Sequence, residues 1–211
     1  MLNHKAYWDA QFSKHHYIWG ETPSQSAGIA LSLFRRHGVN KILIPGSGYG
    51  RNSKLFSSAG FEVSGIEISE EACTLAREYD PATKVYPGSF LDDHLVQDSF
   101  EGIYCFNVLQ LFLQADRIRF IQKSAQMLSP NGFMFFTGIS DQDTSFGQGQ
   151  EVEKNTFAVT PEKILHYFTL DDLKEHFEGF KILETGSFED QVTHTLYGSK
   201  SYKIRYIFVC R

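Results

Sequence analysis

The sequence predicts a doubly wound α/β protein: a mostly parallel, seven-stranded, Rossmann-like sheet with helices on both faces and a C-terminal antiparallel hairpin. Short apolar runs alternate with helical patterns from residue 41 to 140, the order of βα units that builds a parallel sheet. These runs are continuously apolar, as in strands that are covered on both faces. Two further apolar segments, 181–190 and 202–211, with a turn around 197–201, predict the hairpin.

The elements follow in order along the chain. Residues 1–40 are rich in aromatic side chains and predict an N-terminal helical cap, in which Ser24 begins a helix that ends at Gly38. Strands are expected at 41–45, 62–68, 83–90, 100–108 and 132–140, and helices at 51–60, 69–79 and 116–129. Ser69 is the expected N-cap of the second of these helices, because acidic residues follow it in the first turn.

The segment 141–168 breaks this alternation. It is polar, contains glycine and shows little periodicity. A stretch of this length without regular structure inside a compact domain is usually a functional loop. We therefore expect an active-site loop at 141–168 and a helix at 169–180, within a single domain that spans 1–211.

The composition argues against several classes of protein. Apolar residues make up 42% of the chain and charged residues 21%, which suits a packed core. The formal charge is −5 and no run of Lys or Arg stands out, so nucleic acid is not an expected partner. No apolar stretch approaches the ~20 residues that span a bilayer, and no apolar signal segment stands at the start, so no membrane partner is expected either.

The three cysteines, Cys73, Cys105 and Cys210, are far apart in the sequence. They form neither a CxxC pair nor a zinc-ligand spacing, and no His/Cys/Asp cluster has metal spacing. The sequence therefore predicts no metal site, and reduced, buried thiols are typical of a cytoplasmic protein.

The stretch "ILIPGSGYGRN", residues 42–52, is the strongest functional signal. Its glycines stand at the end of the first expected strand and before a helix, where ligands bind in a doubly wound sheet. Glycine permits positive φ and a close approach of the backbone, and the helix start offers free N–H groups. Position 51 is Arg, so the dinucleotide pattern G-x-G-x-x-G is not met, and the Gly-Lys-Ser/Thr of a phosphate-binding loop is absent.

Glu67 ends the next expected strand, 21 residues after Gly46. An acid at about 20 residues' spacing can accept hydrogen bonds from both hydroxyls of an adenosine ribose. The apolar neighbours Ile66 and Ile68 favour this role over that of an ordinary solvated carboxylate. The glycine loop and Glu67 together predict a nucleoside ligand.

The set of motifs resembles the class I S-adenosylmethionine-dependent methyltransferases. "ILIPGSGYGRN" is similar to the family's first motif, "GIEIS" to its second, "PGSF" to its third, "EGIYCFNVLQLF" to its fourth, and "LSPNGFMFFTG" to the strand after it. Within the family, "YIWGETPSQ" and "HYFTLDDLKEHFEGFKI" resemble segments of small-molecule methyltransferases of the tellurite-resistance and thiopurine type. The resemblance implies S-adenosylmethionine as cofactor, S-adenosylhomocysteine as product, and in-line transfer of a methyl group to a small-molecule acceptor.

The resemblance also implies which residues contact the cofactor. They lie before the first strand, in the glycine loop and after the next three strands: Trp19; Gly46, Ser47, Gly48, Gly50, Arg51 and Asn52; Glu67 and Ile68; Ser89 and Phe90; and Phe106, Asn107 and Val108. Some alternatives stay open. Arg51 is either a contact or a surface charge, and Phe90 and Val108 either contact the cofactor or only pack the core. Trp8, Tyr17 and Trp19 either cover the cofactor or only pack the N-terminal helices.

Two positions depart from the family pattern. Ile44 stands where an acid is usual, and the Pro45 that follows is similar to the thiopurine and halide/thiol branch. Ser89 stands where many members have an Asp for the adenine amine, so either Asp92, Asp93 or backbone groups serve there.

His166 and Tyr167 follow the expected loop and resemble a recurring element of the family. Histidine titrates near neutral pH, which makes His166 the first candidate base, although a hydrogen-bonded structural histidine is an equal alternative. His15, His16 and His194 are weaker candidates.

Three other classes of protein are alternatives to a small-molecule methyltransferase. A methyltransferase of nucleic acid is disfavoured, because "FNVL" replaces the Asn/Asp-Pro-Pro-Tyr element, and the glycine spacing disfavours a nicotinamide oxidoreductase. A non-catalytic S-adenosylmethionine-binding sensor or regulator stays open, since it would share every cofactor residue. The sequence indicates neither the acceptor atom nor the oligomeric state.

Overall fold

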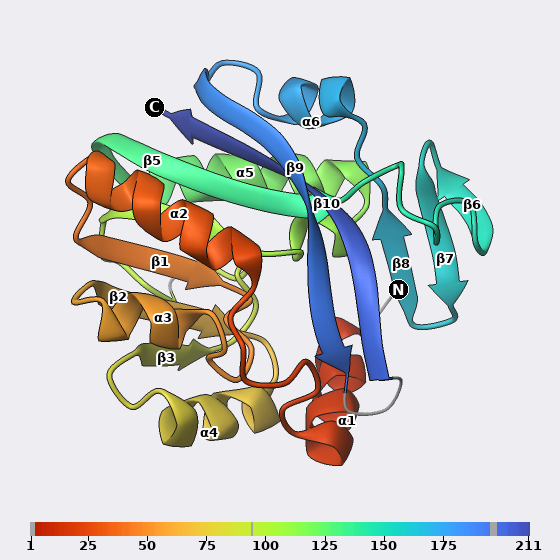
Figure 1. Ribbon diagram of the computed structural model, residues 1–211, viewed down its shortest axis with the longest axis horizontal. Helices are drawn as coiled ribbons and strands as arrows, with labels where there is room; N and C mark the ends of the chain where they lie inside the picture. The colour runs from red at the N-terminus through yellow and green to blue at the C-terminus, as the bar shows by residue number, and fades with distance from the viewer. Residues whose placement is uncertain (1–2, 94, 195–197) are drawn as a thin grey trace.

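The computed structural model describes residues 3–93, 95–194 and 198–211, and it confirms the predicted fold class (Figure 1). The strands of the large sheet are β1 (Lys41–Pro45), β2 (Glu62–Glu67), β3 (Lys84–Pro87), β4 (Phe100–Cys105), β5 (Leu128–Ile139), β9 (Lys181–His194) and β10 (Gly198–Cys210). Their order is β3-β2-β1-β4-β5-β10-β9. Strands β1 to β5 pair in parallel, whereas β10 is antiparallel to both β5 and β9.

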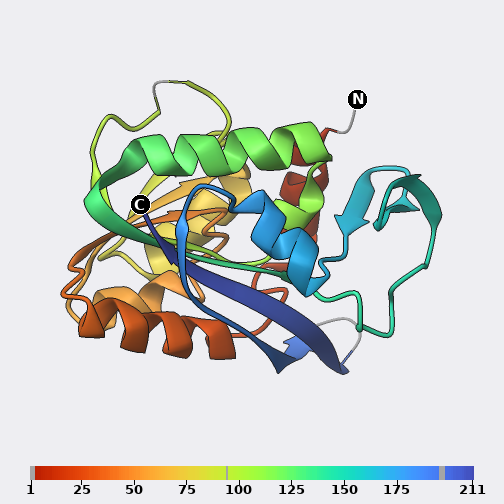
Figure 2. The ribbon, with the colours of Figure 1, turned by 90° about the horizontal axis from the view of Figure 1, so that it is seen from above.

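Helices cover both faces of this sheet (Figure 2). They are α1 (His4–His15), α2 (Gln25–Arg36), α3 (Ser53–Ser58), α4 (Glu70–Tyr79), the short 3₁₀ helix η1 (Leu109–Leu111), α5 (Gln114–Met127) and α6 (Leu170–His176). One core cluster joins α2 and α3 to the sheet through Phe34 and Phe56, and another joins α5 and α6 through Phe120 and Phe177. Among the described residues, no helix combines the length and apolar character needed to cross a membrane.

The expected N-caps are confirmed. The Ser24 Oγ accepts a hydrogen bond from the Ser26 N–H at the start of α2, and the Ser69 Oγ accepts one from the Ala72 N–H at the start of α4. The extent of the N-terminal cap is corrected, because α2 buries Ala27 and other apolar side chains against the sheet. Only α1 and the turn after it extend over the end of the sheet (Figure 1).

The segment 141–168 is not an unstructured loop. It contains a three-stranded antiparallel sheet of β6 (Gln150–Glu153), β7 (Thr156–Thr160) and β8 (Lys163–His166). Strands of four or five residues are too short to show a clear alternation in the sequence. Asn155, at φ 58°, makes the tight turn between β6 and β7. The irregular part is limited to the residues before β6.

The C-terminal hairpin is longer than expected. Strand β9 runs through His194 and β10 begins at Gly198, so residues 198–201 of the expected turn belong to β10, and Tyr197 lies outside the described residues. The two strands pass the end of β5 and reach down to α1 (Figure 1). The hairpin, α1 and β8 therefore meet at one end of the molecule.

Candidate active site

A pocket of about 280 Å³ lies at the carboxyl ends of the parallel strands. It is placed where the strand order reverses between β1 and β4, the position at which doubly wound sheets bind ligands. Its walls come from the ends of β1, β2 and β4, from α1, from β8 and from the β9–β10 hairpin. The volume is close to the lower end of the range for small-molecule sites, about 300–1,000 Å³.

The glycine loop forms the floor of this pocket. Gly46 and Gly48 have φ of 66° and 58°, values that L side chains rarely adopt. A Cβ added to Gly46 would lie 2.3 Å from the Val108 Cγ2, so no other residue fits beside that side chain. The predicted need for glycine at this turn is thus explained by both the backbone angle and the close approach of Val108.

Glu67 faces the same loop. Its side chain is buried, its Oε2 accepts a hydrogen bond from the Gly48 N–H at 2.8 Å, and its Oε1 accepts one from the Ser69 N–H at 2.9 Å. Burial raises the pKa of Glu67, and the N–H groups of Ser69 and Gly48 oppose that shift. The Ile68 N–H also lowers the pKa of this carboxylate, and because a carboxylate has about four acceptor positions, Glu67 keeps capacity for a hydroxyl donor of a ligand.

The glycine loop and the start of α3 bring three polar side chains to the pocket. Arg51 is buried, its Nη1 donates to the Trp19 carbonyl at 3.2 Å, and its guanidinium lies 5.7 Å from the centroid of the Phe106 ring. It is therefore not a surface charge. The Asn52 Oδ1 accepts from the Ser24 N–H at 2.9 Å. The buried Ser47 Oγ has no hydrogen-bond partner in the described part of the chain, which suits a ligand contact.

The next wall follows β2 and β3. Ile68, Ser89 and Phe90 line the pocket, and Phe90 also packs on Phe120 with 4.3 Å between ring centroids. Phe90 therefore belongs to both the pocket and the core. Asp92 does not line the pocket; its Oδ2 accepts from the Ser89 N–H at 3.2 Å. Asp93 is exposed and is also outside the lining.

Phe106, Asn107 and Val108 leave the end of β4 and line the pocket, as predicted. Asn107 has φ 55°, and its N–H donates to the Thr137 Oγ1 at 2.9 Å, which holds this turn on β5. Among the predicted cofactor residues, Gly50 is the exception. Its backbone faces Ser53 and Asp80, and it does not line the pocket.

Aromatic side chains close the N-terminal side. Trp8 and Trp19 line the pocket, and they also pack on each other with 5.8 Å between ring centroids. The buried Tyr49 of the glycine loop stacks on Trp19 and donates from its hydroxyl to the Gly20 carbonyl. The tryptophans therefore pack α1 and its turn and also line the pocket.

His166 and Tyr167, the expected catalytic pair, are not beside the pocket. Both are buried outside its lining. The His166 Nδ1 contacts the Thr156 Oγ1 at 2.8 Å and its Nε2 contacts the Asp172 Oδ2 at 2.7 Å, while the Tyr167 hydroxyl donates to the Ser145 carbonyl at 2.9 Å. The structure thus corrects the catalytic assignment in favour of the structural alternative. Of the weaker candidates, His15 and His16 are also outside the pocket lining, and the side chain of His194 lies outside the described residues.

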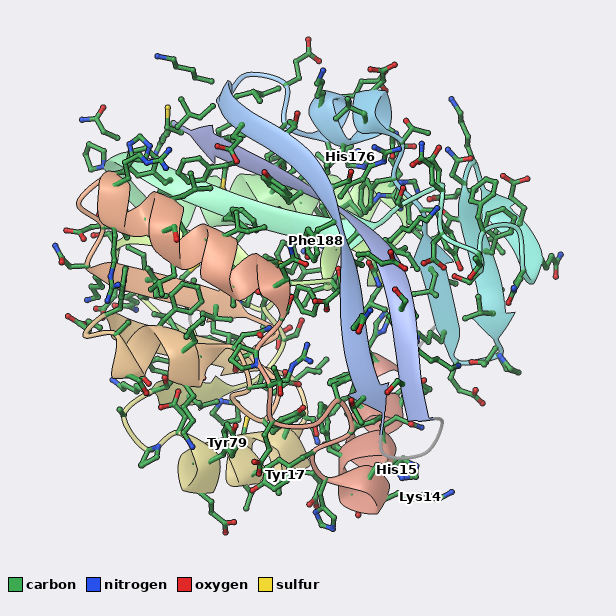
Figure 3. All side chains as sticks on the ribbon, in the orientation of Figure 1. Lys14, His15, Tyr17, Tyr79, His176 and Phe188 are labelled. Atoms are coloured by element: carbon green, nitrogen blue, oxygen red, sulfur yellow. The ribbon has the colours of Figure 1, made fainter. Side chains whose placement is uncertain are left out.

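The sequence did not indicate that His166, Asp172 and His176 come together. The cluster's member His176 lies at α6, at the opposite end of the molecule from Tyr17 and Tyr79, whose rings pack on each other (Figure 3). The Arg117 Nε donates to the His176 Nε2 at 2.9 Å, and the His176 Nδ1 bonds the Asp172 carbonyl. A cation would compete with this guanidinium and with the hydrogen bonds of both rings, so the cluster fits a structural network that joins α5, β8 and α6.

We expect His166→Ala to lower the free energy of unfolding by about 1–3 kcal/mol, because it leaves the Asp172 carboxylate and Thr156 without their buried partner. Burial lowers the pKa of His166, so the folded state disfavours its protonation, and its contribution decreases as the pH falls below the ordinary value of 6.5. Urea denaturation from pH 7 to 5 should therefore show a steeper loss of stability in the wild type than in the variant. Equal slopes, or a weakened affinity for S-adenosylmethionine, would contradict the structural role.

Sequence reasoning missed several polar residues of the pocket wall, among them Tyr104, Lys163, Asp190 and Tyr202. Burial lowers the pKa of the Lys163 ammonium, whose Nζ lies 5.9 Å from the centroid of the Trp8 ring. The sequence held only a weak signal for Asp190. This acid shares one face of its strand with the apolar residues Phe188 and Val192, two positions before and after it. Nothing in the local sequence indicates that this face turns toward the glycine loop.

Comparison with known proteins agrees with this geometry. Residues 43–136 match the family described as a methyltransferase domain. A sequence search of curated proteins gives no match.

Many solved structures share the fold, and three illustrate the range. One, from work on the conversion of a disulfide bond into a thioacetal group in echinomycin biosynthesis, has a TM-score of 0.76 and 16% identity over 98% of this chain and 91% of that one. TehB from Haemophilus influenzae has a TM-score of 0.66 and 15% sequence identity, over 97% of this chain and 67% of that one. A third is the 1,6-didemethyltoxoflavin N1-methyltransferase of Burkholderia thailandensis, solved with bound 1,6-didemethyltoxoflavin and S-adenosylhomocysteine. It has a TM-score of 0.71 and 15% sequence identity, over 98% of this chain and 86% of that one.

Proposed function

We propose that this chain, which belongs to the class I S-adenosylmethionine-dependent methyltransferases, transfers the methyl group of S-adenosylmethionine to a small-molecule acceptor in the pocket above β1 and β4. The observation that supports this most strongly is the junction of the glycine loop and Glu67 on one wall of the pocket. It combines a close backbone approach with a buried carboxylate that keeps acceptor positions for a ribose. The unpartnered Ser47 Oγ adds a polar contact at the same wall.

Each part of the wall has a separate role in this proposal. Gly46 and Gly48 bring the backbone against the methionine portion, and Asn52 and Arg51 lie at the helix start, where a carboxylate is favoured. Glu67 accepts hydrogen bonds from the ribose hydroxyls. Ile68 contacts one adenine face, and Ser89 and Phe90 lie at the adenine edge.

When bound, S-adenosylmethionine supplies a methyl group that its positive sulfur already activates. The protein then has to align the acceptor and exclude water. The aromatic rings of Trp8, Trp19 and Phe106 line the pocket, where they exclude solvent and can attract a cation through their faces. The segment Phe106–Val108 lies next to Gly46, so it holds the acceptor side of the reacting centre against the cofactor side.

A small acceptor is supported by the way the pocket is roofed. Helix α1, strand β8 and the β9–β10 hairpin all contribute lining side chains, so the pocket is walled from several sides and leaves little open groove for a polymer. The toxoflavin methyltransferase of similar fold also acts on a small molecule. A polymer substrate would need one of these three elements to move.

We expect calorimetric titration to show micromolar binding of S-adenosylmethionine and S-adenosylhomocysteine and no binding of NAD. The reason is that the loop spacing and Glu67 suit an adenosine with a methionine portion, whereas the dinucleotide glycine pattern is not met. Incubation with a panel of thiols, phenols, amines and metalloid oxyanions should then release S-adenosylhomocysteine, detected by mass spectrometry. Binding without any turnover would favour the non-catalytic alternative, and no binding would refute the cofactor site itself.

A further inference from the structure

The β9–β10 hairpin carries a buried carboxylate that faces the pocket from the side opposite the adenosine wall. Asp190 of β9 is 3% exposed and lines the pocket. Its Oδ1 accepts a hydrogen bond from the Gln25 N–H at 3.1 Å, whereas its Oδ2 is buried and has no hydrogen-bond partner among the residues that the structure describes. A buried oxygen without a partner is uncommon in native proteins, because it loses its hydration without replacement.

The fold explains how this carboxylate is tolerated. Gln25 begins α2, so the Asp190 carboxylate lies at the positive end of a 12-residue helix. Burial nevertheless raises the pKa of Asp190, against the opposing influence of the Gln25 N–H, the Arg51 guanidinium and the nearby Ser24 hydroxyl. The Ser24 Oγ lies 2.8 Å from the Ser26 Oγ and makes no hydrogen bond to the Asp190 Oδ2. Arg51 acts on Asp190 through its charge, while its Nη1 donates to the Trp19 carbonyl at 3.2 Å. A hydrogen-bond donor supplied by a ligand would complete the coordination of Oδ2.

The surroundings of Asp190 indicate the kind of ligand. Val192 of β9 and Tyr202 and Ile204 of β10 line the same part of the wall, and Tyr202 is the direct cross-strand partner of Asp190. These strands lie beyond β4 and β5 in the sheet, on the side away from β2 and β3, which carry the proposed ribose and adenine contacts. The hairpin side of the acceptor part therefore combines apolar and aromatic side chains with one carboxylate oxygen, and Lys163 of β8 lines the same pocket.

We propose that Asp190 binds the methyl acceptor by accepting a hydrogen bond from an N–H or O–H group carried on a small aromatic ring, an inference that rests on the methyltransferase function proposed above. The aromatic ring follows from the apolar walls, and the donor follows from the free Oδ2. Asp190 thus selects acceptors that present a donor over ring-matched molecules that lack one.

The test uses Asp190→Asn. The amide oxygen of asparagine can keep the hydrogen bond from the Gln25 N–H, so the start of α2 is preserved, while an NH₂ donor replaces the free carboxylate oxygen. Glu189→Gln is the matched control. Glu189 directly precedes Asp190 in β9, is exposed, and therefore lies on the opposite face of the strand. Thermal unfolding should give the same midpoint for all three proteins.

Binding is measured by ligand-observed NMR on protein saturated with S-adenosylhomocysteine, with the probe pairs phenol and anisole, and aniline and N,N-dimethylaniline. The wild type and Glu189→Gln should bind the donor member of at least one pair roughly tenfold more tightly, and Asp190→Asn should lose this preference. The oxygen and nitrogen pairs separate the two kinds of donor.

The outcomes separate this inference from the function on which it rests. If the wild type binds S-adenosylhomocysteine but shows no preference within either pair, or if Asp190→Asn keeps the preference, the role of Asp190 is refuted and the cofactor site stands. If the wild type does not bind S-adenosylhomocysteine, the proposed function fails and this inference fails with it.

Discussion

Replacing Glu67 by alanine is expected to weaken the binding of S-adenosylmethionine about ten- to hundredfold. Hydrogen bonds to a charged group are typically worth about 1.5–3 kcal/mol, and the proposed ribose contacts depend on this carboxylate. The Gly48 N–H, which donates to the Glu67 Oε2 at 2.8 Å, would also lose its acceptor, so the loop under the ligand would be held less firmly. Calorimetric titration with S-adenosylmethionine measures the effect.

Two further variants separate recognition from folding. Glu67→Gln keeps an acceptor oxygen but loses the charge, so its loss of affinity should be smaller than that of the alanine variant. Glu71→Ala is a matched control, because Glu71 is an exposed acid in the first turn of α4, and its affinity should equal that of the wild type. Wild-type affinity in Glu67→Ala, with a normal urea unfolding curve, would remove Glu67 from the cofactor site.

Gly46→Ala should be the most damaging single substitution of the glycine loop. A positive φ costs an L residue about 1–2 kcal/mol, and forcing a methyl group into a packed site costs about 1–3 kcal/mol more. The added Cβ would lie 2.3 Å from the Val108 Cγ2, so either the loop or the turn after β4 must move. We expect a free energy of unfolding lower by about 2–5 kcal/mol and cofactor affinity reduced more than tenfold, measured by urea denaturation and calorimetry.

Gly38→Ala is the control for the backbone angle. Gly38 has φ 71°, close to the 66° of Gly46, but an added Cβ there meets no atom within 4 Å. It should show only the cost of the angle and no change in affinity. In the double variant Gly46→Ala/Val108→Ala, the smaller side chain should recover part of the stability. Equal effects of Gly38→Ala and Gly46→Ala would show that the contact with Val108 is unimportant.

The cofactor wall could be predicted because its signals are local. The turn at 46–48 needs glycine for its backbone angles, and Glu67 follows the next strand within a short stretch of sequence. A parallel sheet necessarily brings the ends of such neighbouring strands to one edge. These residues therefore meet through constraints that a single βα repeat already contains. Gly50 was expected among the contacts but does not line the pocket, because the glycine pattern does not reveal which way each peptide faces.

The acceptor wall was not predictable in the same way. Asp190, Tyr202 and Lys163 belong to β9, β10 and β8, which reach the pocket only after the hairpin and the small antiparallel sheet have packed against the rest of the fold. The strands of that small sheet are short, and their pairing depends on packing of Phe157 and Tyr167 against Ile139 rather than on local propensity.

His166 illustrates the same difference. Its ordinary titration range made it a reasonable candidate base from the sequence, but the tertiary structure decides what its two ring nitrogens contact, and both are used by Thr156 and Asp172. The sequence by itself determined the fold class, the match of residues 43–136 to a methyltransferase domain and the glycine-loop side of the pocket, because backbone angles and strand order encode them locally. The tertiary structure alone decided which charged side chains lie buried in the pocket, because burial depends on contacts between segments far apart in the chain.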